Sequence, residues 1–296
     1  SEPCRVGPID RLWADRTVGA VFVHGPKSVW IERAGVVGPA TETFRDRAHL
    51  LELVGRLARP TADGVVAFRR RDGSEGTVVF PPAAPDGPVV VLRRGEPGLA
   101  TVDRLVAAGV VDRSIADLLR MATRARLDIA VIGPEGSGKT ALLAALLRDA
   151  ASSRRVLSLA RHRDFRWPLP GKVELVASEA KFAALAAAAL QFQPDLVVVD
   201  SVRAEDRPAV EKLLGRPGRG TVVALARGLP EPPVDLVVRL GRAGDGLFRA
   251  VSVEDAAGAQ LFAYRDGGFR RGTAVPTFAE ALRRAGFGDA LRTVLG

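Results

Sequence analysis

Eight consecutive residues in the middle of the chain have the types and spacing of a phosphate-binding loop. They run Gly133-Pro134-Glu135-Gly136-Ser137-Gly138-Lys139-Thr140 and fit the pattern G-x-x-x-x-G-K-[ST]. The glycines allow backbone N–H groups to turn inward around phosphate oxygens. We expect Lys139 to reach the β- and γ-phosphates and Thr140 to hold Mg²⁺. The sequence therefore predicts a site for ATP together with Mg²⁺.

The residues on either side of this loop predict the elements that would hold it. The apolar run Leu127–Ile132 predicts a buried strand, and Ala141–Leu147 predicts a helix whose N-terminus adds partial positive charge. We expect the nucleotide contacts to extend to Ala141. Glu135 is unusual, because a carboxylate facing the phosphates would weaken binding, so we expect its side chain to point to solvent. A chance glycine turn is the weaker interpretation, since strand, loop and helix follow in order.

A second stretch supplies a candidate carboxylate for the metal. Leu196–Val199 predicts a buried strand that ends at Asp200, and sites of open α/β sheets lie at the carboxyl ends of strands. We interpret Asp200 as lying near Mg²⁺; an ordinary acid at a strand end is the alternative. The next residue is Ser201, which cannot accept a proton as a glutamate would.

Around these stretches the pattern predicts two α/β domains. Residues 1–95 form a small N-terminal α/β domain, 96–101 a linker rich in glycine and proline, and 102–296 the domain with the phosphate loop. In the second domain strands alternate with helices, which favours a mostly parallel sheet, and its last sixty residues suggest an antiparallel extension. Thr277-Phe278-Ala279-Glu280 fits a capping box that opens a closing helix.

Arginine dominates the charged residues. The 296 residues carry a net charge of +9, and of 43 basic residues five are lysine, so 38 are arginine. A surface for nucleic acid or anionic lipid is one interpretation. We favour a coding bias toward arginine, alanine, glycine and valine, because no compact basic run with interleaved aromatic residues appears.

Three further features bear on the class of protein. A lone cysteine, Cys4, forbids an intrachain disulfide and indicates a reducing compartment. The most apolar run, Phe182–Leu190, is far shorter than the ~20 residues that span a bilayer, so we expect no membrane span. The chain begins at Ser1 without a methionine or a signal-peptide pattern, so we expect it to be a piece of a longer protein.

With these motifs in place, the chain resembles the ATPases of the type II/type IV secretion superfamily, most of all the CpaF-like motors of Tad pilus assembly. The likeness covers nearly the whole length. Val23–Arg33 is similar to the family's V-N-G-x-x-x-V-Y-V-E-R stretch, Arg45–Leu50 to its F-x-D-x-x-H-L segment, and Asp86–Arg93 to its D-G-P-x-x-x-I-R stretch. Leu105–Thr140 is similar to the segment that leads through the family's Walker A site.

The resemblance implies a RecA-like P-loop domain and a hexameric ring whose nucleotide site is closed by arginines from the N-terminal domain. Arg93 matches such an arginine best and Arg69 more weakly; a solvated arginine on an edge strand is the alternative for both. It also implies inner-membrane pilus or secretion platform proteins as partners, and a cytoplasmic location at the inner membrane.

Three motifs depart from the family pattern. The family's Walker B strand ends G-E-x-R with a catalytic glutamate, and this chain has Ser201 there. Its acidic box ends I-E-D, where this chain has Ala160-Arg161. Its histidine box ends T-I-H-A, where this chain has Leu225 at the position of the histidine. The position of His162 in the sequence does not support it as a substitute for that histidine.

Three hypotheses follow, in order of preference. The first is an ATP-binding homologue with weak or absent hydrolysis, a pseudo-ATPase that assembles with itself or regulates an active paralogous ATPase. The second is an active hexameric motor in which Asp200 positions metal and water. The third is a basic nucleic-acid-binding module, which we disfavour for the reason given above.

Overall fold

The computed structural model describes residues 7–33, 36–62, 64–70, 74–94, 101–151, 154–161, 171–177 and 181–295. The chain divides into two compact units, Ser1–Pro97 and Gly98–Gly296. The predicted linker, 96–101, lies outside the described residues except for Thr101.

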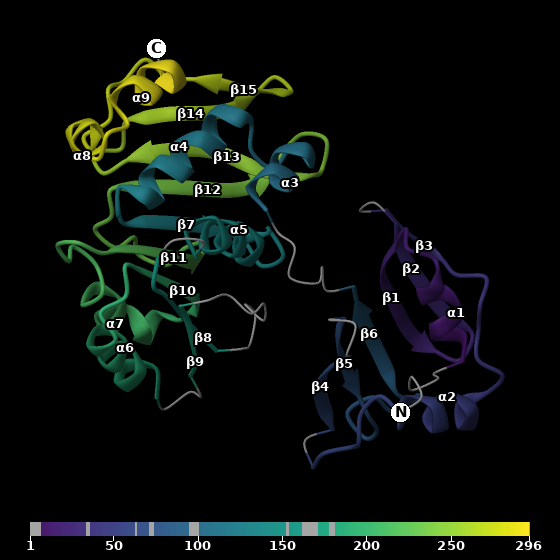
Figure 1. Ribbon diagram of the computed structural model, residues 1–296. Helices are drawn as coiled ribbons and strands as arrows, with labels where there is room; N and C mark the ends of the chain where they lie inside the picture. Colours follow the sequence, from purple (N-terminus) through teal and green to yellow (C-terminus); the bar gives the residue numbers. More distant parts are fainter. Residues whose placement is uncertain are drawn as a thin grey trace. The chain divides into compact units, whose positions relative to one another are not determined.

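The first unit is an antiparallel sheet with helices against one face (Figure 1). Its strand order is β3-β2-β1-β6-β5-β4, with bounds Val36–Pro39, Ser28–Arg33, Val18–Gly25, Val89–Arg93, Glu75–Val79 and Val65–Arg69. The helices α1 (Pro8–Ala14) and α2 (Arg47–Val54) bury Ile9 and Leu50 against the alternate inward residues of the strands. Helix α2 begins after Asp46, whose carboxylate accepts from His49 N, and ends before Gly55.

The second unit is built on a nine-stranded sheet of the expected kind. Its strand order is β15-β14-β13-β12-β7-β11-β10-β8-β9. The strands from β12 to β9 pair in parallel, and β12 to β15 pair antiparallel, which confirms the mostly parallel α/β sheet with an antiparallel extension. The bounds are β7 Ile129–Gly133, β8 Val156–Ala160, β9 Lys172–Val176, β10 Leu196–Val202, β11 Gly220–Ala226, β12 Leu236–Arg242, β13 Phe248–Asp255, β14 Gln260–Arg265 and β15 Gly268–Arg271.

Helices cover both faces of this sheet and form two cores (Figure 1). One core contains leucines of α4 and α5 and of the two closing helices, α8 and α9. The other core contains apolar residues of α6 and α7. The buried strands contribute alternate residues to each, so Val198 faces the first core and Val199 the second. The bounds are α3 Val102–Ala107, α4 Arg113–Arg124, α5 Lys139–Ala151, α6 Phe182–Gln191, η2 Ala204–Asp206, α7 Arg207–Glu211, α8 Ala279–Arg284 and α9 Gly288–Leu295.

The end of the chain differs from the expected single closing helix. Two short helices, α8 and α9, stand there, and the capping box expected at Thr277 is wrong. Helix α8 begins after Phe278, which makes no side-chain capping hydrogen bond. The Thr277 backbone N–H instead donates to Asp255 Oδ2 at 2.9 Å, which holds Thr277 outside the helix.

A buried carboxylate ties β7 to the turn before β11. Asp128 Oδ1 accepts from Thr221 N at 2.8 Å and Oδ2 accepts from Gly215 N at 2.6 Å. Burial raises the pKa of Asp128, and these two backbone donors oppose the rise. The carboxylate therefore satisfies two backbone N–H groups.

We expect Asp128→Asn to destabilise the protein by about 1–3 kcal/mol, because an amide has one acceptor oxygen and leaves one of the two N–H donors unsatisfied. Denaturant unfolding measures the effect. Asp266→Asn is the matched control, since Asp266 is exposed at φ 52°, a conformation that asparagine also adopts. Equal stability of the two variants would contradict the assignment.

Among the described residues, no helix is long and apolar enough to cross a membrane.

Candidate functional site

The predicted phosphate loop joins β7 to α5 at the carboxyl edge of the sheet. Gly136 and Gly138 adopt φ of 73° and 89°, a left-handed conformation that glycine adopts at little cost. Lys139 folds back over the loop and its Nζ donates to the Gly133 and Pro134 carbonyl oxygens at 2.9 and 2.8 Å. The ammonium group is thus held at the mouth of the loop by carbonyls that a phosphate can replace.

Space inside the loop is tight around its first glycine. A Cβ on Gly133 would lie 2.5 Å from Ser137 Oγ and 2.9 Å from Leu240 O, so only glycine fits between β7 and β12. Ser137 is buried, and its Oγ has no hydrogen-bond partner among the described residues. A buried hydroxyl without a partner inside a loop of this shape fits a ligand with oxygen acceptors. Glu135 is exposed, in line with the expected orientation toward solvent.

The two candidate metal residues, Thr140 at the start of α5 and Asp200 of β10, lie in contact. Asp200 is 3% exposed, and its Oδ2 accepts from Thr140 Oγ1 at 2.6 Å. A bulge in β10 turns this carboxylate toward the loop, because Asp200 and Ser201 together oppose a single residue of β11. Ser201 takes φ 58° at the bulge and its backbone N–H donates to Asp200 Oδ1 at 2.7 Å.

The side-chain oxygens of Thr140 and Asp200 suit Mg²⁺ better than they suit a metal that takes most of its ligands from the protein. Mg²⁺ is usually held by one or two carboxylate or hydroxyl oxygens, with water and phosphate completing its shell. Thr140 and Asp200 supply two such oxygens. In the part of the chain that the structure describes, no cluster of three His, Cys, Asp or Glu side chains could hold a metal by itself.

A buried ion pair stands at the position to which the resemblance assigns an acidic box. Arg161 follows β8, and its Nη2 lies 2.6 Å from Asp206 Oδ2, with the two side chains 7% and 5% exposed. Its guanidinium also lies 5.3 Å from the centre of the Phe182 ring. Asp206 accepts from Arg203 N as well, so the pair fixes the segment that follows β10. Sequence reasoning missed Asp206, because 45 residues separate it from Arg161 and no local pattern links them.

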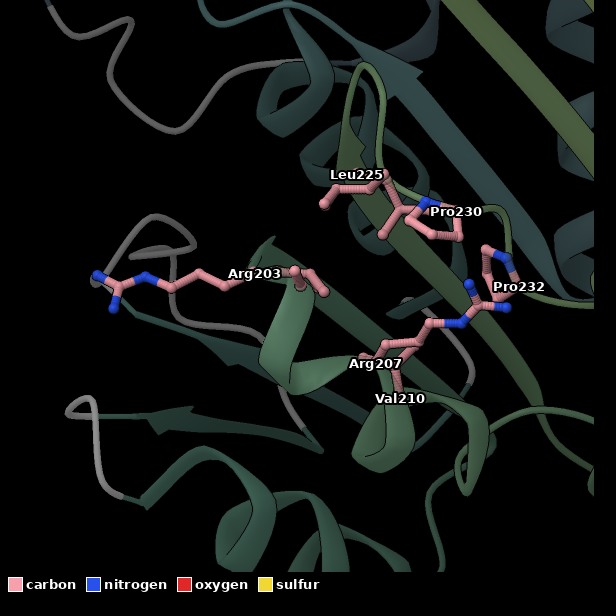
Figure 2. A pocket seen from close by; sticks show the side chains of 9 residues that line it. Arg203, Arg207, Val210, Leu225, Pro230 and Pro232 are labelled. Atoms are coloured by element: carbon pink, nitrogen blue, oxygen red, sulfur yellow. The ribbon is translucent and has the colours of Figure 1, made fainter.

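An apolar residue, Leu225, occupies the position at which the resemblance implies a histidine. Leu225 is 4% exposed on β11, between Ile132 of β7 and Val202 of β10. It lines a pocket together with apolar residues of α7 and of the loop after β11 (Figure 2). Leu225, Pro230 and Pro232 lie together on one side of this pocket, and Arg203 extends away from it (Figure 2). Leu225, Pro230 and Pro232 carry no side-chain group that can donate or accept a proton.

The two candidate arginines lie on the sheet of the first unit. Arg93 ends β6, which lies between β1 and β5, so the alternative of an edge strand is wrong for this residue. Its side chain is exposed, with the guanidinium 5.4 Å from the centre of the Phe22 ring. Arg69 ends β4, which is an edge strand. His162 lies outside the described residues.

Burial lowers the pKa of the Lys139 ammonium, and the carboxylates of Asp200 and Glu135 partly oppose the shift. Bound phosphate would favour the charged form and raise this pKa again. The affinity for nucleotide is therefore full below the lowered pKa of the free protein and falls as the pH rises through it.

We expect the ATP affinity of the wild type to fall as the pH rises through the lowered pKa of Lys139, at a lower pH than an ordinary lysine would give, with proton uptake on binding over this range. Calorimetry in buffers of different ionisation enthalpy measures both quantities. Lys139→Arg is the control, because a guanidinium stays charged over this range and should remove the pH dependence. The same pH profile in both proteins would contradict the assignment.

The chain is similar in sequence to a secretion system family and to conjugal transfer proteins. Residues 77–212 match the family described as "Type II/IV secretion system protein". A putative conjugal transfer protein of Mycobacterium tuberculosis is 30% identical over 218 residues, which cover 65% of this chain and 60% of that protein. Conjugal transfer protein TrbB of Rhizobium radiobacter is 27% identical over 226 residues, which cover 71% of this chain and 68% of that protein. The chain thus spans about three fifths of the first of these relatives.

Solved structures share the fold. The ATPase DotB of Legionella pneumophila aligns with a TM-score of 0.58 at 18% identity, over 86% of this chain and 83% of DotB. The pilus retraction motor PilT with bound ADP aligns with a TM-score of 0.60 at 12% identity, over 96% of this chain and 88% of PilT. This likeness shows the fold, a RecA-like unit preceded by an N-terminal domain. Residues 77–212 are thus similar to the type II/IV secretion system family, and the solved structures share the fold of the chain.

Proposed function

We propose that this chain binds ATP·Mg²⁺ through residues 133–141 and hydrolyses it weakly or not at all. One observation carries the proposal. Lys139 Nζ lies over the loop and Thr140 contacts Asp200, an arrangement that supports nucleotide binding, whereas Ser201 and Leu225 occupy the positions at which the resemblance implies a glutamate and a histidine.

The size of the expected loss supports this separation of binding from turnover. A general base typically contributes about 10²–10⁴ in rate. Groups that act as a unit are not additive, so the loss of glutamate, acidic box and histidine need not exceed the loss of one by much. Nucleotide affinity rests on other groups, the backbone amides, Lys139 and Thr140.

In the cell we propose a motor-like or regulatory subunit of a type II/IV secretion or Tad pilus machine, of CpaF-like descent. The chain would form a hexamer or join an active paralogous ATPase, at the cytoplasmic side of the inner membrane beside a platform protein. Arg93, and more weakly Arg69, would reach the nucleotide of a neighbouring subunit. A chain that stays monomeric at all concentrations with ATP would count against the ring.

A second candidate function is an active ATPase that uses Asp200. It is favoured by the 2.6 Å contact between Asp200 and Thr140, which sets a buried carboxylate next to the expected metal. Steady-state turnover at saturating ATP·Mg²⁺ separates the two functions. Turnover of about 1 s⁻¹ or more that disappears in Lys139→Ala would favour the active enzyme.

A further inference from the structure

The hairpin of β12 and β13 stands next to the phosphate loop. Strands β12 and β7 pair in parallel up to Arg239 and Ile132, and Leu240 O lies 2.9 Å from where a Cβ on Gly133 would be. Strand β12 continues to Arg242 before the hairpin turns. The tip of the hairpin therefore extends past the start of the loop at the same edge of the sheet.

The sheet order gives the direction in which a bound nucleotide would run. Asp200 and Thr140 mark the end that carries the metal and the γ-phosphate, and Asp200 belongs to β10. Strand β11 separates β10 from β7 on one side, and β12 adjoins β7 on the other. With its β- and γ-phosphates at Lys139, the nucleotide extends its sugar and base away from β10, toward β12.

An arginine stacked on a phenylalanine occupies that side. The Arg242 Cζ lies 4.9 Å from the centre of the Phe248 ring, its Nη1 donates to Gly246 O at 3.2 Å, and the side chain is exposed. Arg242 and Phe248 are paired in register, so both side chains leave the same face. Two residues earlier, Leu240 belongs to the core that also contains the leucines of α5, so this face is on the side of the sheet that α5 covers.

The part of β13 next to the hairpin tip is held by residues near the start of the same unit. Ala250 N donates to Val110 O at 2.8 Å, and Arg249 Nη1 donates to Gly109 O. Arg249 also pairs with Asp245 in the hairpin turn. These contacts hold Phe248 in place and leave Arg242 as the exposed member of the pair.

We propose that the Arg242–Phe248 pair is the platform on which the base of the bound nucleotide stacks. A guanidinium plane with one face on a phenyl ring presents its other face to a second planar ring, and arginine stacks well on nucleobases. Stacking requires a π-face and no particular edge, so the platform takes adenine and guanine nucleotides alike. The inference rests on the proposed nucleotide binding.

The test compares a nucleotide with a ligand that lacks a base. Calorimetry measures the dissociation constants of ATP·Mg²⁺ and tripolyphosphate·Mg²⁺ for the wild type, Arg242→Ala, Arg242→Lys and the control Arg216→Ala. We expect Arg242→Ala to weaken ATP binding about tenfold and to leave tripolyphosphate binding unchanged. Arg242→Lys keeps the charge without the plane and should lose as much. Arg216 is exposed in the turn before β11, and its removal should change neither constant.

Two results would overturn the platform. Unchanged ATP affinity in Arg242→Ala shows that the base does not rest there. An equal loss for ATP and tripolyphosphate, rescued in Arg242→Lys, shows that Arg242 acts through its charge on phosphate. If neither ligand binds the wild type, the proposed function itself fails and the platform with it, which is a distinguishable outcome.

Discussion

Replacing Lys139 with alanine is expected to weaken ATP·Mg²⁺ binding by about a hundredfold or more. Truncation of a charge that is paired with an anion at a partly desolvated site typically costs 2–5 kcal/mol, and 1.4 kcal/mol is a factor of ten. Among the described residues, Lys139 Nζ donates hydrogen bonds only to the Gly133 and Pro134 carbonyls, so the fold should survive its loss. Calorimetric titration of both proteins measures the change.

Lys212→Ala is the matched control for this change. Lys212 is exposed at the end of α7, before the turn that leads to β11 at the opposite edge of the sheet. Its removal takes away the same charge without touching the loop, so it should alter ATP affinity by less than about twofold at physiological ionic strength. Equal losses in the two variants would mean that the net charge of the protein, and not the loop, binds ATP.

Replacing Asp200 with alanine is expected to remove most of the contribution of Mg²⁺ to binding. In the wild type, adding Mg²⁺ should tighten ATP binding, because Thr140 and Asp200 offer oxygens to the metal. Losing a group that ligates a metal or orients its ligand commonly costs about 10–100-fold in metal affinity. We therefore expect the Asp200→Ala variant to bind ATP about as weakly in the presence of Mg²⁺ as in the presence of EDTA.

Asp195→Ala tests whether the loss of another carboxylate close in sequence also removes the contribution of Mg²⁺ to binding. Asp195 precedes β10 at the opposite end of the strand and pairs with Arg126 at 2.9 Å. Its loss should leave the Mg²⁺ dependence intact. A wild-type affinity that does not depend on Mg²⁺, or an Asp200→Ala variant that keeps the dependence, would contradict the metal assignment.

The sequence could predict the anchoring part of the site because its information is local. Strand, glycines, lysine and helix are consecutive, so each constrains the next, and Gly136 and Gly138 adopt the positive φ that their type suggests. The parallel sheet was also readable from alternating apolar runs. The bulge at Asp200 was not, because a serine at φ 58° leaves no local signature.

The remaining features depend on contacts between distant residues. The charge of Arg161 is neutralised by Asp206, and Leu225 packs among prolines of a following loop; neither partner follows from spacing. The failed capping box at Thr277 has the same origin, because the pattern was correct locally and Asp255 competes for its backbone N–H. Tertiary hydrogen bonds thus override local preference where a carboxylate is buried nearby.

The central claim, that the site binds ATP without turning it over, is tested most directly by one experiment. Wild-type protein is titrated with ATP·Mg²⁺ in a calorimeter, and the nucleotide is then recovered and its composition determined. We predict saturable binding, lost in Lys139→Ala, with the nucleotide recovered as ATP. Recovery of ADP and phosphate, formed at about 1 s⁻¹ or faster by the wild type and not by Lys139→Ala, would contradict the claim.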